Sequence, residues 1–284
     1  MEFETLLITH PAPFVAHVQL NRPERRNALN IAMWEELPKA FDALAVDPNI
    51  RAIVISGNGK AFCSGIDLQG ATANGGILNM QHQEMFEESP LDVAREARNM
   101  GAKIRSYQQS LSSLDECPKP VIAAIHGFCV GGGVDLISSC DIRWASKDSI
   151  FSIKEVDVGL CADVGSLNRL PKICGNSSWL RELAYSARHF GAQEALNQGL
   201  LSKVFDSTDQ VKQEAIKFAA TLALKSPIAI QGTKVNLNYS RDHSVKESME
   251  YTALWNQSQL LTEDIPKSVM AMMSKSDPPV FAKL

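Results

Sequence analysis

The 284-residue sequence lacks any run of about 18 apolar residues, the length that a membrane-spanning helix needs. Its start, MEFETLLITH, also lacks the basic-then-apolar plan of a signal peptide and the Arg-rich plan of a transit peptide. We therefore expect no membrane span. With 45% hydrophobic and 21% charged residues, the composition is that of an ordinary globular protein with a large core.

A strong net charge and closely paired cysteines are missing as well. The formal net charge of −4 gives no general attraction to nucleic acid or to an anionic membrane surface. None of the six cysteines is spaced as CxxC, which disfavours a zinc site and a disulfide framework and favours reduced, buried thiols. Cys63, in FCSG, could be argued as a nucleophile, but no His stands out as its partner.

Several catalytic signatures are absent too. SGNGKAF (56–62) lacks the spacing and the hydroxyl residue of a P-loop, and GGGVDL (131–136) lacks the G-x-G-x-x-G order of a dinucleotide fold. There is no G-x-S-x-G and no H-E-x-x-H. These absences disfavour nucleotide hydrolysis, hydride transfer and serine hydrolysis.

The chain does contain alternating strand and helix patterns, which indicate a mainly parallel α/β sheet with ligands in loops at the strand ends. Strands are predicted over 14–21, 51–59, 119–130 and 141–146, and helices over 28–47, 91–117 and from 134 onward. Residues 69–90 are expected to form a loop or weak helix over a site. From residue 192 the pattern is nearly all helical, which predicts a core (1–191) followed by a helical region (192–284).

The segment FSIKEVDVGLCADVG (151–165) places three acids among apolar residues and glycines. Phe151, Ile153 and Glu155 share parity, so on a strand Glu155 would follow two apolar side chains onto the buried side. A buried carboxylate is costly unless it is protonated, paired or used in chemistry. Glu155 is therefore a candidate catalytic residue.

Two glycine segments, AFCSGIDL (61–68) and HGFCVGGGVDL (126–136), each follow an apolar strand. Glycine lets a backbone approach a ligand closely and turn its N–H groups outward. Two such loops at neighbouring strand ends could aim two N–H donors at one oxygen and so form an oxyanion hole. Their spacing alone allows two tight turns that pack on each other equally well.

Together with LNRPERRNALN (20–30), these segments resemble the crotonase (enoyl-CoA hydratase/isomerase) superfamily, from about Leu20 to the C-terminus. The resemblance implies a repeated ββα spiral core, a helical C-terminal trimerisation region and acyl-CoA thioester substrates. It also implies that two backbone N–H groups stabilise a thioester enolate. Carried over by motif, these donors belong to Ile66 and Gly132.

Three acidic residues, Asp135, Glu155 and Asp163, indicate which members of this superfamily the chain resembles most. Asp135 and Glu155 stand where hydratases of the superfamily have two glutamates, and Asp163 stands where they have a glycine. This trio, with KEVDVGLCADVGSLNRLPK (154–172), is similar to the Δ3,5-Δ2,4-dienoyl-CoA isomerases of fatty acid β-oxidation. We expect Glu155 to be an ionised base at C2 and Asp163 a protonated acid at C6, with Asp135 hydrogen-bonded to Glu155. The residues alone also allow Asp163 to cap a helix and Asp135 to complement the dipole of its own helix.

The resemblance implies further contacts. The substrate-binding residues are expected to be Ser64, Gly65, Ile66, Asp67, Leu68 and Gly132. Arg22, Arg25 and Arg26 are expected to meet the CoA phosphates or to form a solvated turn. No metal or redox cofactor is expected, since CoA arrives as part of the substrate, and the assembly is expected to be a homotrimer or homohexamer. His126 is expected to pack in the core, and Asp157 to be structural.

The last three residues, Ala282, Lys283 and Leu284, resemble the Ser-Lys-Leu peroxisomal address. The preceding DPPVF favours an extended, accessible end. We expect binding to a peroxisomal import receptor and a peroxisomal location if the source is eukaryotic, and a cytoplasmic location if it is bacterial.

Two other functions compete with this interpretation. One is an enoyl-CoA hydratase or a Δ3-Δ2 enoyl-CoA isomerase of the same superfamily. The other is a non-catalytic RNA-binding member, against which the acidic charge balance and the absence of a long basic stretch weigh.

Overall fold

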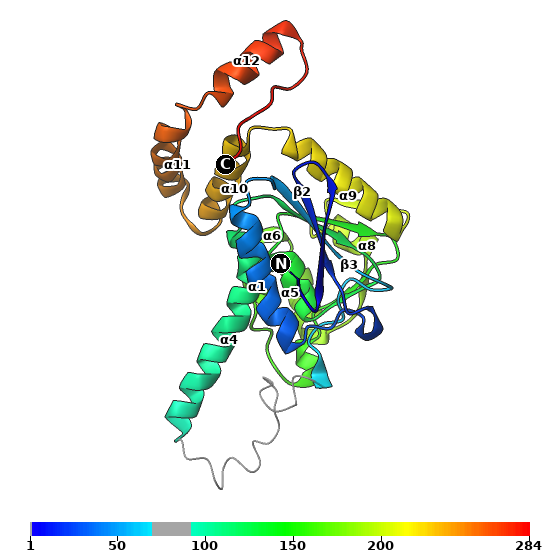
Figure 1. Cartoon of the computed structure of the whole chain (residues 1–284). Helices are drawn as coiled ribbons and strands as arrows, with labels where there is room; N and C mark the ends of the chain where they lie inside the picture. The colour runs from blue at the N-terminus through cyan, green and yellow to red at the C-terminus, as the bar shows by residue number, and fades with distance from the viewer. Residues whose placement is uncertain (1, 70–91) are drawn as a thin grey trace.

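The computed structural model describes residues 2–69 and 92–284, so the loop predicted for residues 69–90 lies almost entirely outside the described residues. The main sheet has the strand order β1-β2-β3-β4-β6-β9 (Figure 1). Its strands are β1 (Leu6–Ala12), β2 (Val15–Leu20), β3 (Ala52–Gly57), β4 (Val121–Ile125), β6 (Ile142–Ser146) and β9 (Lys203–Phe205). Only β1 runs antiparallel to its neighbour in this sheet, so the predicted mainly parallel α/β architecture is confirmed.

Both faces of the main sheet are covered by helices, which explains why its central strands are continuously apolar. Alternate side chains of β3 point in opposite directions: Ile53 and Ile55 join one buried cluster, and Val54 joins the other. Helices α1 (Ile31–Val46) and α4 (Val93–Glu116) pack on the first face. Helix α9 (Thr208–Ala223) covers the second face, through Val211, Ala215, Ala219 and Ala223.

A second, three-stranded sheet lies next to the first and consists of β5 (Phe128–Val130), β7 (Ile150–Ser152) and β8 (Phe190–Gly191). The single strand predicted over 119–130 is therefore wrong, because β4 and β5 belong to different sheets. The chain turns between them at Gly127, which has a φ of +54° and packs against the carbonyl oxygen of Lys60. A side chain there would collide with that carbonyl, so the turn needs glycine.

Short helices connect these strands and surround the strand ends. They are the 3₁₀ helices Pro23–Arg25 and Glu155–Val158 and the α-helices α5 (Gly132–Ser138), α6 (Ser166–Ile173), α7 (Ser177–Ser186) and α8 (Ala192–Asn197). Helix α5 begins within the glycine triplet, and α6 begins directly after the acid-bearing segment. The second glycine segment and the acid-bearing segment therefore each lead into the N-terminus of a helix.

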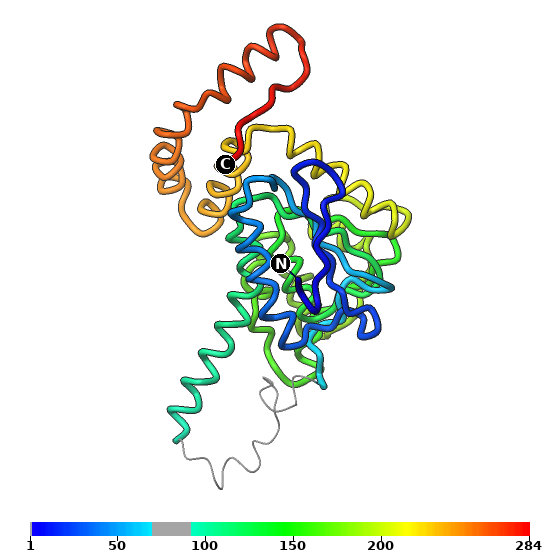
Figure 2. Tube along the Cα trace, in the orientation of Figure 1, coloured from blue at the N-terminus to red at the C-terminus, as the bar shows by residue number. Residues whose placement is uncertain are grey.

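The C-terminal region continues with α10 (Pro227–Asp242), α11 (Val245–Gln259) and α12 (Asp264–Ser274), which extend to one side of the core (Figures 1 and 2). Region 192–284 also supplies β9 to the main sheet and α9 to one of its faces, so it is not purely helical. Its boundary at residue 191 stays a prediction. None of the helices among the described residues is long and apolar enough to cross a membrane.

Candidate active site

A cavity of about 280 Å³ opens where the two glycine segments meet the acid-bearing segment. Its wall contains most of the predicted site residues: Ser64, Gly65, Ile66, Leu68, Gly132, Glu155 and Asp163. The rest of the lining is mainly apolar, with Trp34 and Tyr107 stacked on each other at a centroid distance of 4.7 Å. A larger hollow, of about 670 Å³, lies among α10, α11 and α12 and contains none of these predicted residues.

Two backbone N–H groups are available in the cavity wall. Ile66 forms a parallel bridge with Leu29, in which the bonds run from Leu29 N–H to the Gly65 carbonyl and from Asp67 N–H to the Leu29 carbonyl. The N–H of Ile66 therefore points away from Leu29. Gly132 is the first residue of α5, so its N–H has no partner within the helix. Among the described residues, neither N–H has an acceptor.

These two donors lie close together because glycines let their loops pack tightly. A Cβ built on Gly132 would lie 3.9 Å from the nitrogen of Ile66, and one on Gly133 would lie 2.9 Å from the Cys63 carbonyl oxygen. Gly65 has a φ of +91° and Gly131 a φ of +52°, which residues with side chains rarely adopt. The predicted oxyanion-hole loops are thus side by side, at the N-terminus of a helix whose dipole favours negative charge.

Glu155 lies beside these loops, although not in the way that its parity predicted. Strand β7 ends at Ser152, and Glu155 begins a 3₁₀ helix, so the predicted strand position is wrong. Its Oε1 would be 3.1 Å from a Cβ built on Gly131. Burial, followed by the nearby charge of Asp135, raises the pKa of Glu155 to about 7. A carboxylate with this pKa is a stronger base than an ordinary glutamate and is still available near neutral pH.

Asp163 is half-buried and lines the same cavity. It does not cap α6, because the N-cap position belongs to Gly165, which has no side chain, and the N–H of Ser166 at this helix end is bonded to Asp135 instead. Its backbone carbonyl accepts a 2.7 Å hydrogen bond from Nε2 of Gln108 on α4. Burial raises the pKa of the Asp163 carboxyl above its usual value. The structure therefore leaves this carboxyl available to a ligand in the cavity.

Asp135 is completely buried behind the cavity wall. One carboxylate oxygen accepts the backbone N–H of Ser166 at 2.5 Å, at the N-terminus of α6. Burial raises the pKa of Asp135 to about 6, even though this hydrogen bond favours the ionised form. Its other oxygen and Oε2 of Glu155 have no hydrogen-bond partner among the described residues, so the predicted hydrogen bond between Asp135 and Glu155 is wrong. Asp135 influences Glu155 through its charge instead.

For the complex with substrate, the predicted state has Glu155 ionised and Asp163 protonated, and that state stays a prediction; the pKa values describe the free protein, in which both carboxyl groups have raised pKa values. The larger upward displacement belongs to Glu155, because it is more buried and faces Asp135. In the free protein near pH 7, Glu155 therefore holds its proton for part of the time. Occupation of the cavity has to change this balance before the two acids can take the predicted roles.

Asp67, which was predicted to bind the substrate, lies outside the cavity. Asp67 is absent from the cavity wall and forms a 2.9 Å ion pair with Arg22. Arg25 and Arg26 are exposed; Arg25 donates to the Gln69 side chain, and the guanidinium of Arg26 lies 5.8 Å from the ring centroid of Phe128. A CoA contact of these two arginines stays a prediction.

With one exception, the residues set aside by sequence behave as expected. Cys63 is buried, and burial raises the pKa of its thiol to about 12, so it is unsuited to act as a nucleophile. All six cysteines are free and five are buried, but Cys161 is exposed, so the prediction of buried thiols is wrong for that residue. His126 is buried and contacts the Gly59 carbonyl, and Asp157 pairs with Lys154.

Sequence reasoning missed the part of the wall that α4 supplies. Met100, Ile104 and Tyr107 line the cavity at i, i+4 and i+7 spacing, so they share one face of the helix. That spacing was readable in the sequence, but nothing there identified which face of the helix would meet the glycine loops. The next residue after Tyr107, Gln108, donates a hydrogen bond to the backbone carbonyl of Asp163.

The chain resembles known proteins over nearly its whole length. The family model described as enoyl-CoA hydratase/isomerase matches residues 12–282. The chain is 50% identical to the mitochondrial Delta(3,5)-Delta(2,4)-dienoyl-CoA isomerase of Mus musculus over 275 residues, which cover 97% of this chain and 81% of that protein. Identity to the peroxisomal Delta(3,5)-Delta(2,4)-dienoyl-CoA isomerase of Arabidopsis thaliana is 43%, over 95% of this chain and 93% of that protein.

The fold comparison agrees with these sequence matches. The crystal structure of an enoyl-CoA hydratase from Bacillus anthracis superposes with a TM-score of 0.84 at 25% identity. The match covers 98% of this chain and 99% of that one.

Proposed function

Because the chain belongs to the enoyl-CoA hydratase/isomerase (crotonase) family, we propose that it isomerises 3,5-dienoyl-CoA to 2,4-dienoyl-CoA in fatty acid β-oxidation. The observation that carries this proposal is the presence of Glu155 and Asp163 in one largely apolar cavity with the N–H groups of Ile66 and Gly132. Relatives with the name Delta(3,5)-Delta(2,4)-dienoyl-CoA isomerase at 43–50% identity support it.

The proposed reaction begins when the thioester oxygen accepts hydrogen bonds from the N–H groups of Ile66 and Gly132. Removal of a proton from C2 produces a dienolate whose negative charge extends from this oxygen along the chain. The two donors stabilise that charge more than they stabilise the neutral thioester, which is the requirement for catalysis. The apolar lining strengthens these hydrogen bonds because it excludes water.

The two carboxyl groups divide the proton transfers. Glu155 lies against Gly131, next to the oxygen-binding N–H groups, so it is the acid that the C2 carbon would meet. The C2–H bond breaks with its proton going to Glu155, the double bonds shift, and Asp163 donates its proton to form the C6–H bond. Because C2 and C6 are four carbons apart, one carboxylate would not serve both positions.

Substrate binding supplies the change in proton affinity that this division needs. Asp163 is only half-buried in the free protein. An acyl chain that lies across it would remove its remaining water and raise its pKa further, which favours the protonated form. No electrons are exchanged with an outside acceptor, so the proposed reaction requires no metal or redox cofactor, and CoA enters as part of the substrate.

We expect proton abstraction to follow the ionisation of Glu155. In an Asp163→Asn variant, the rate of hydrogen exchange at C2 should rise with pH and level off above the pKa of Glu155, since only its ionised form is a base. That pKa is about 7 in the unchanged protein and should be lower in the variant, because the charge of Asp163 contributes to raising it. The measurement is the pH dependence of deuterium incorporation into a 3,5-dienoyl-CoA. A rate that is constant through this range would exclude Glu155 as the base.

A hydratase is the main competitor, and the position of Asp135 disfavours it. Hydratases of the superfamily would need both acids at positions 135 and 155 to hold one water in the cavity. Here Asp135 is completely buried, does not line the cavity and holds the Ser166 N–H. Purified protein should form conjugated dienoyl product from a 3,5-dienoyl-CoA and should not hydrate a 2-enoyl-CoA. Hydration without diene conversion would overturn the proposal.

We also propose that the chain assembles into a homotrimer or homohexamer through its C-terminal region. Large apolar side chains are exposed along α10 to α12, which is typical of surfaces that another subunit covers. They include Leu237, Leu254, Leu260, Met270, Met272 and Met273. The acidic net charge gives no support to RNA as a partner.

We propose a peroxisomal location, directed by Ala282, Lys283 and Leu284, which remain exposed. Phe281, just before them, is buried, and its carbonyl accepts a 2.8 Å hydrogen bond from Arg51. Deletion of residues 282–284 should therefore leave the fold and the catalysis intact and move the protein from peroxisomes to the cytosol of a eukaryotic host. Fluorescence microscopy of tagged chains tests this; an unchanged peroxisomal pattern would show that these residues are not the address.

A further inference from the structure

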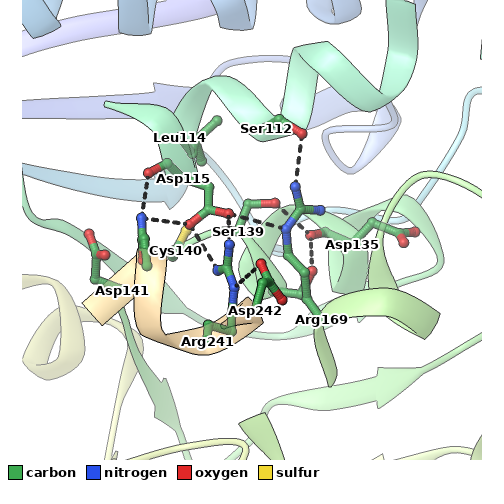
Figure 3. Close-up of polar contacts among 12 residues, drawn as sticks. Ser112, Leu114, Asp115, Asp135, Ser139, Cys140, Asp141, Arg169, Arg241 and Asp242 are labelled. Atoms are coloured by element: carbon green, nitrogen blue, oxygen red, sulfur yellow. Dashed lines mark hydrogen bonds and ion pairs between the residues drawn. The ribbon is translucent and has the colours of Figure 1, made fainter. Parts of the chain in front are cut away.

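A cluster of charged side chains outside the cavity joins three helices that are far apart in the sequence (Figure 3). Asp115 on α4 accepts two hydrogen bonds from Arg241 on α10, at 3.1 and 2.9 Å. The same carboxylate forms a 3.6 Å ion pair with Nε of Arg169 on α6. Only 14% of each of the Asp115 and Arg169 side chains is exposed, so solvent screens this pair less than a surface ion pair.

Arg169 reaches from this cluster to the turn that carries Asp163. Its backbone N–H donates to the carbonyl of Gly165 at 2.9 Å, and its guanidinium fills the space that a side chain on Gly165 would need. Its Nη2 donates to Oγ of Ser112 on α4 at 2.9 Å. Together with Gln108, which holds the Asp163 carbonyl, these contacts fix the turn 163–166 against α4.

The charges that face Arg169 come from three other elements. Asp115 faces it from α4, Arg241 with its neighbour Asp242 from α10, and Asp135 from α5. The positive charge of Arg169 lowers the pKa of Asp135, which burial raises. Asp135, in turn, is the charge that raises the pKa of Glu155 after burial. Arg169 is therefore connected to Asp163 through the contacts of the turn, and to Asp135 through its positive charge.

We propose that Arg169 is a positioning residue for the isomerisation, held by Asp115 and Ser112, and that Arg241 makes its position depend on the seating of α10. This inference rests on the proposed function, since it concerns the placement of Asp163 for proton delivery. Arg169 is not itself part of the cavity wall, so it acts through the turn 163–166 and Asp135. The seating of the C-terminal helices would then affect turnover without contributing a residue to the cavity.

Arg169→Gln should lower kcat for 3,5-dienoyl-CoA by roughly 10²-fold with KM nearly unchanged, because a small misplacement of a catalytic group has an effect of this size. Loss of the positive charge should also raise the pKa of Asp135, which reduces its charge and lowers the pKa of Glu155. The acid limb of kcat/KM should therefore move to lower pH. Arg169→Lys keeps the charge without the planar fork, so it should restore the limb and part of kcat.

The matched control is Arg188→Gln, which removes an arginine paired with Glu182 and Glu194 away from the cavity. It should keep the wild-type kcat and pH profile. Thermal unfolding of each variant shows whether the comparison is made between folded proteins. A folded Arg169→Gln protein with the wild-type kcat and acid limb would overturn the inference, as would the same displacement in Arg188→Gln.

Arg241→Gln tests the connection to α10. It should lower kcat less than Arg169→Gln, and its effect should disappear when Arg169 is already Gln, since interacting residues are not additive. If the effects of the two substitutions on kcat are fully additive in the double variant, the proposed role of Arg241 is wrong. Failure of the wild-type protein to convert the diene would overturn the proposed function itself, whereas a wild-type rate matched by Arg169→Gln would overturn only the role of Arg169.

Discussion

Asp163→Asn and Glu155→Gln are both expected to lose turnover by about 10²–10⁴, the usual contribution of an acid–base group, but to fail at different steps. With Glu155 intact, Asp163→Asn can still form the dienolate and return the proton to C2. In deuterated water it should place deuterium at C2 of recovered substrate while making little product. Glu155→Gln should do neither. NMR of recovered substrate and absorbance of the conjugated product measure both quantities.

The exchange requires that the proton on Glu155 equilibrates with solvent before it returns. Glu155 also borders a separate hollow of about 460 Å³ on the side of α7, and we expect its proton to exchange with solvent from that side. The matched control is Asp157→Asn, an acid in the same segment that pairs with Lys154 and is exposed. It should behave as wild type. Exchange that survives only in Glu155→Gln would reverse the polarity, and normal turnover by Asp163→Asn would remove the main support for a dienoyl isomerase.

Gly132→Pro is expected to lower kcat by about 10²–10³, equivalent to about 3–4 kcal/mol, because it removes one oxyanion donor. Proline has no N–H, yet it is well tolerated at the first position of a helix, which is the place of Gly132 in α5. The variant therefore removes the donor with no change in Glu155 or Asp163. Steady-state kinetics with a 3,5-dienoyl-CoA, with circular dichroism to verify folding, measures the loss.

Gly132→Ala separates the lost donor from added bulk. It keeps the N–H and adds a Cβ that would lie 2.9 Å from Cδ1 of Leu29, the far end of a flexible side chain that can move. It should therefore retain most of the wild-type kcat. A folded Gly132→Pro protein with near-normal turnover, or an equal loss in both variants, would count against Gly132 as an oxyanion donor.

The parts of the site that depend on local backbone chemistry could be predicted from the sequence. The glycines of 61–68 and 126–136 marked the two loops, since few other residues permit the positive φ of Gly65 and Gly131. The alternation of buried side chains in β3 followed from its continuous apolar run between two helical layers. These features depend on neighbours in sequence, so a single chain reveals them.

Features that depend on contacts between distant segments could not be predicted in this way. Asp135 was expected to bond Glu155, but it bonds the N–H of Ser166, because the packing of α5 on α6 brings that free helix end to it. The ion pair of Asp67 with Arg22 and the cluster around Arg169 have the same origin. Charged side chains carry little information about their partners until the fold places them.

Turnover of a 3,5-dienoyl-CoA by the wild-type protein in deuterated water tests the central claim most directly. Two carboxyl groups that exchange with solvent should place deuterium at C6 of the 2,4-dienoyl-CoA product, since Asp163 delivers a solvent-derived proton there. NMR of the product locates the label. Two results would contradict the account. One is product with no deuterium at C6, which would mean that one carboxylate carries the substrate's own proton from C2. The other is addition of water across a double bond.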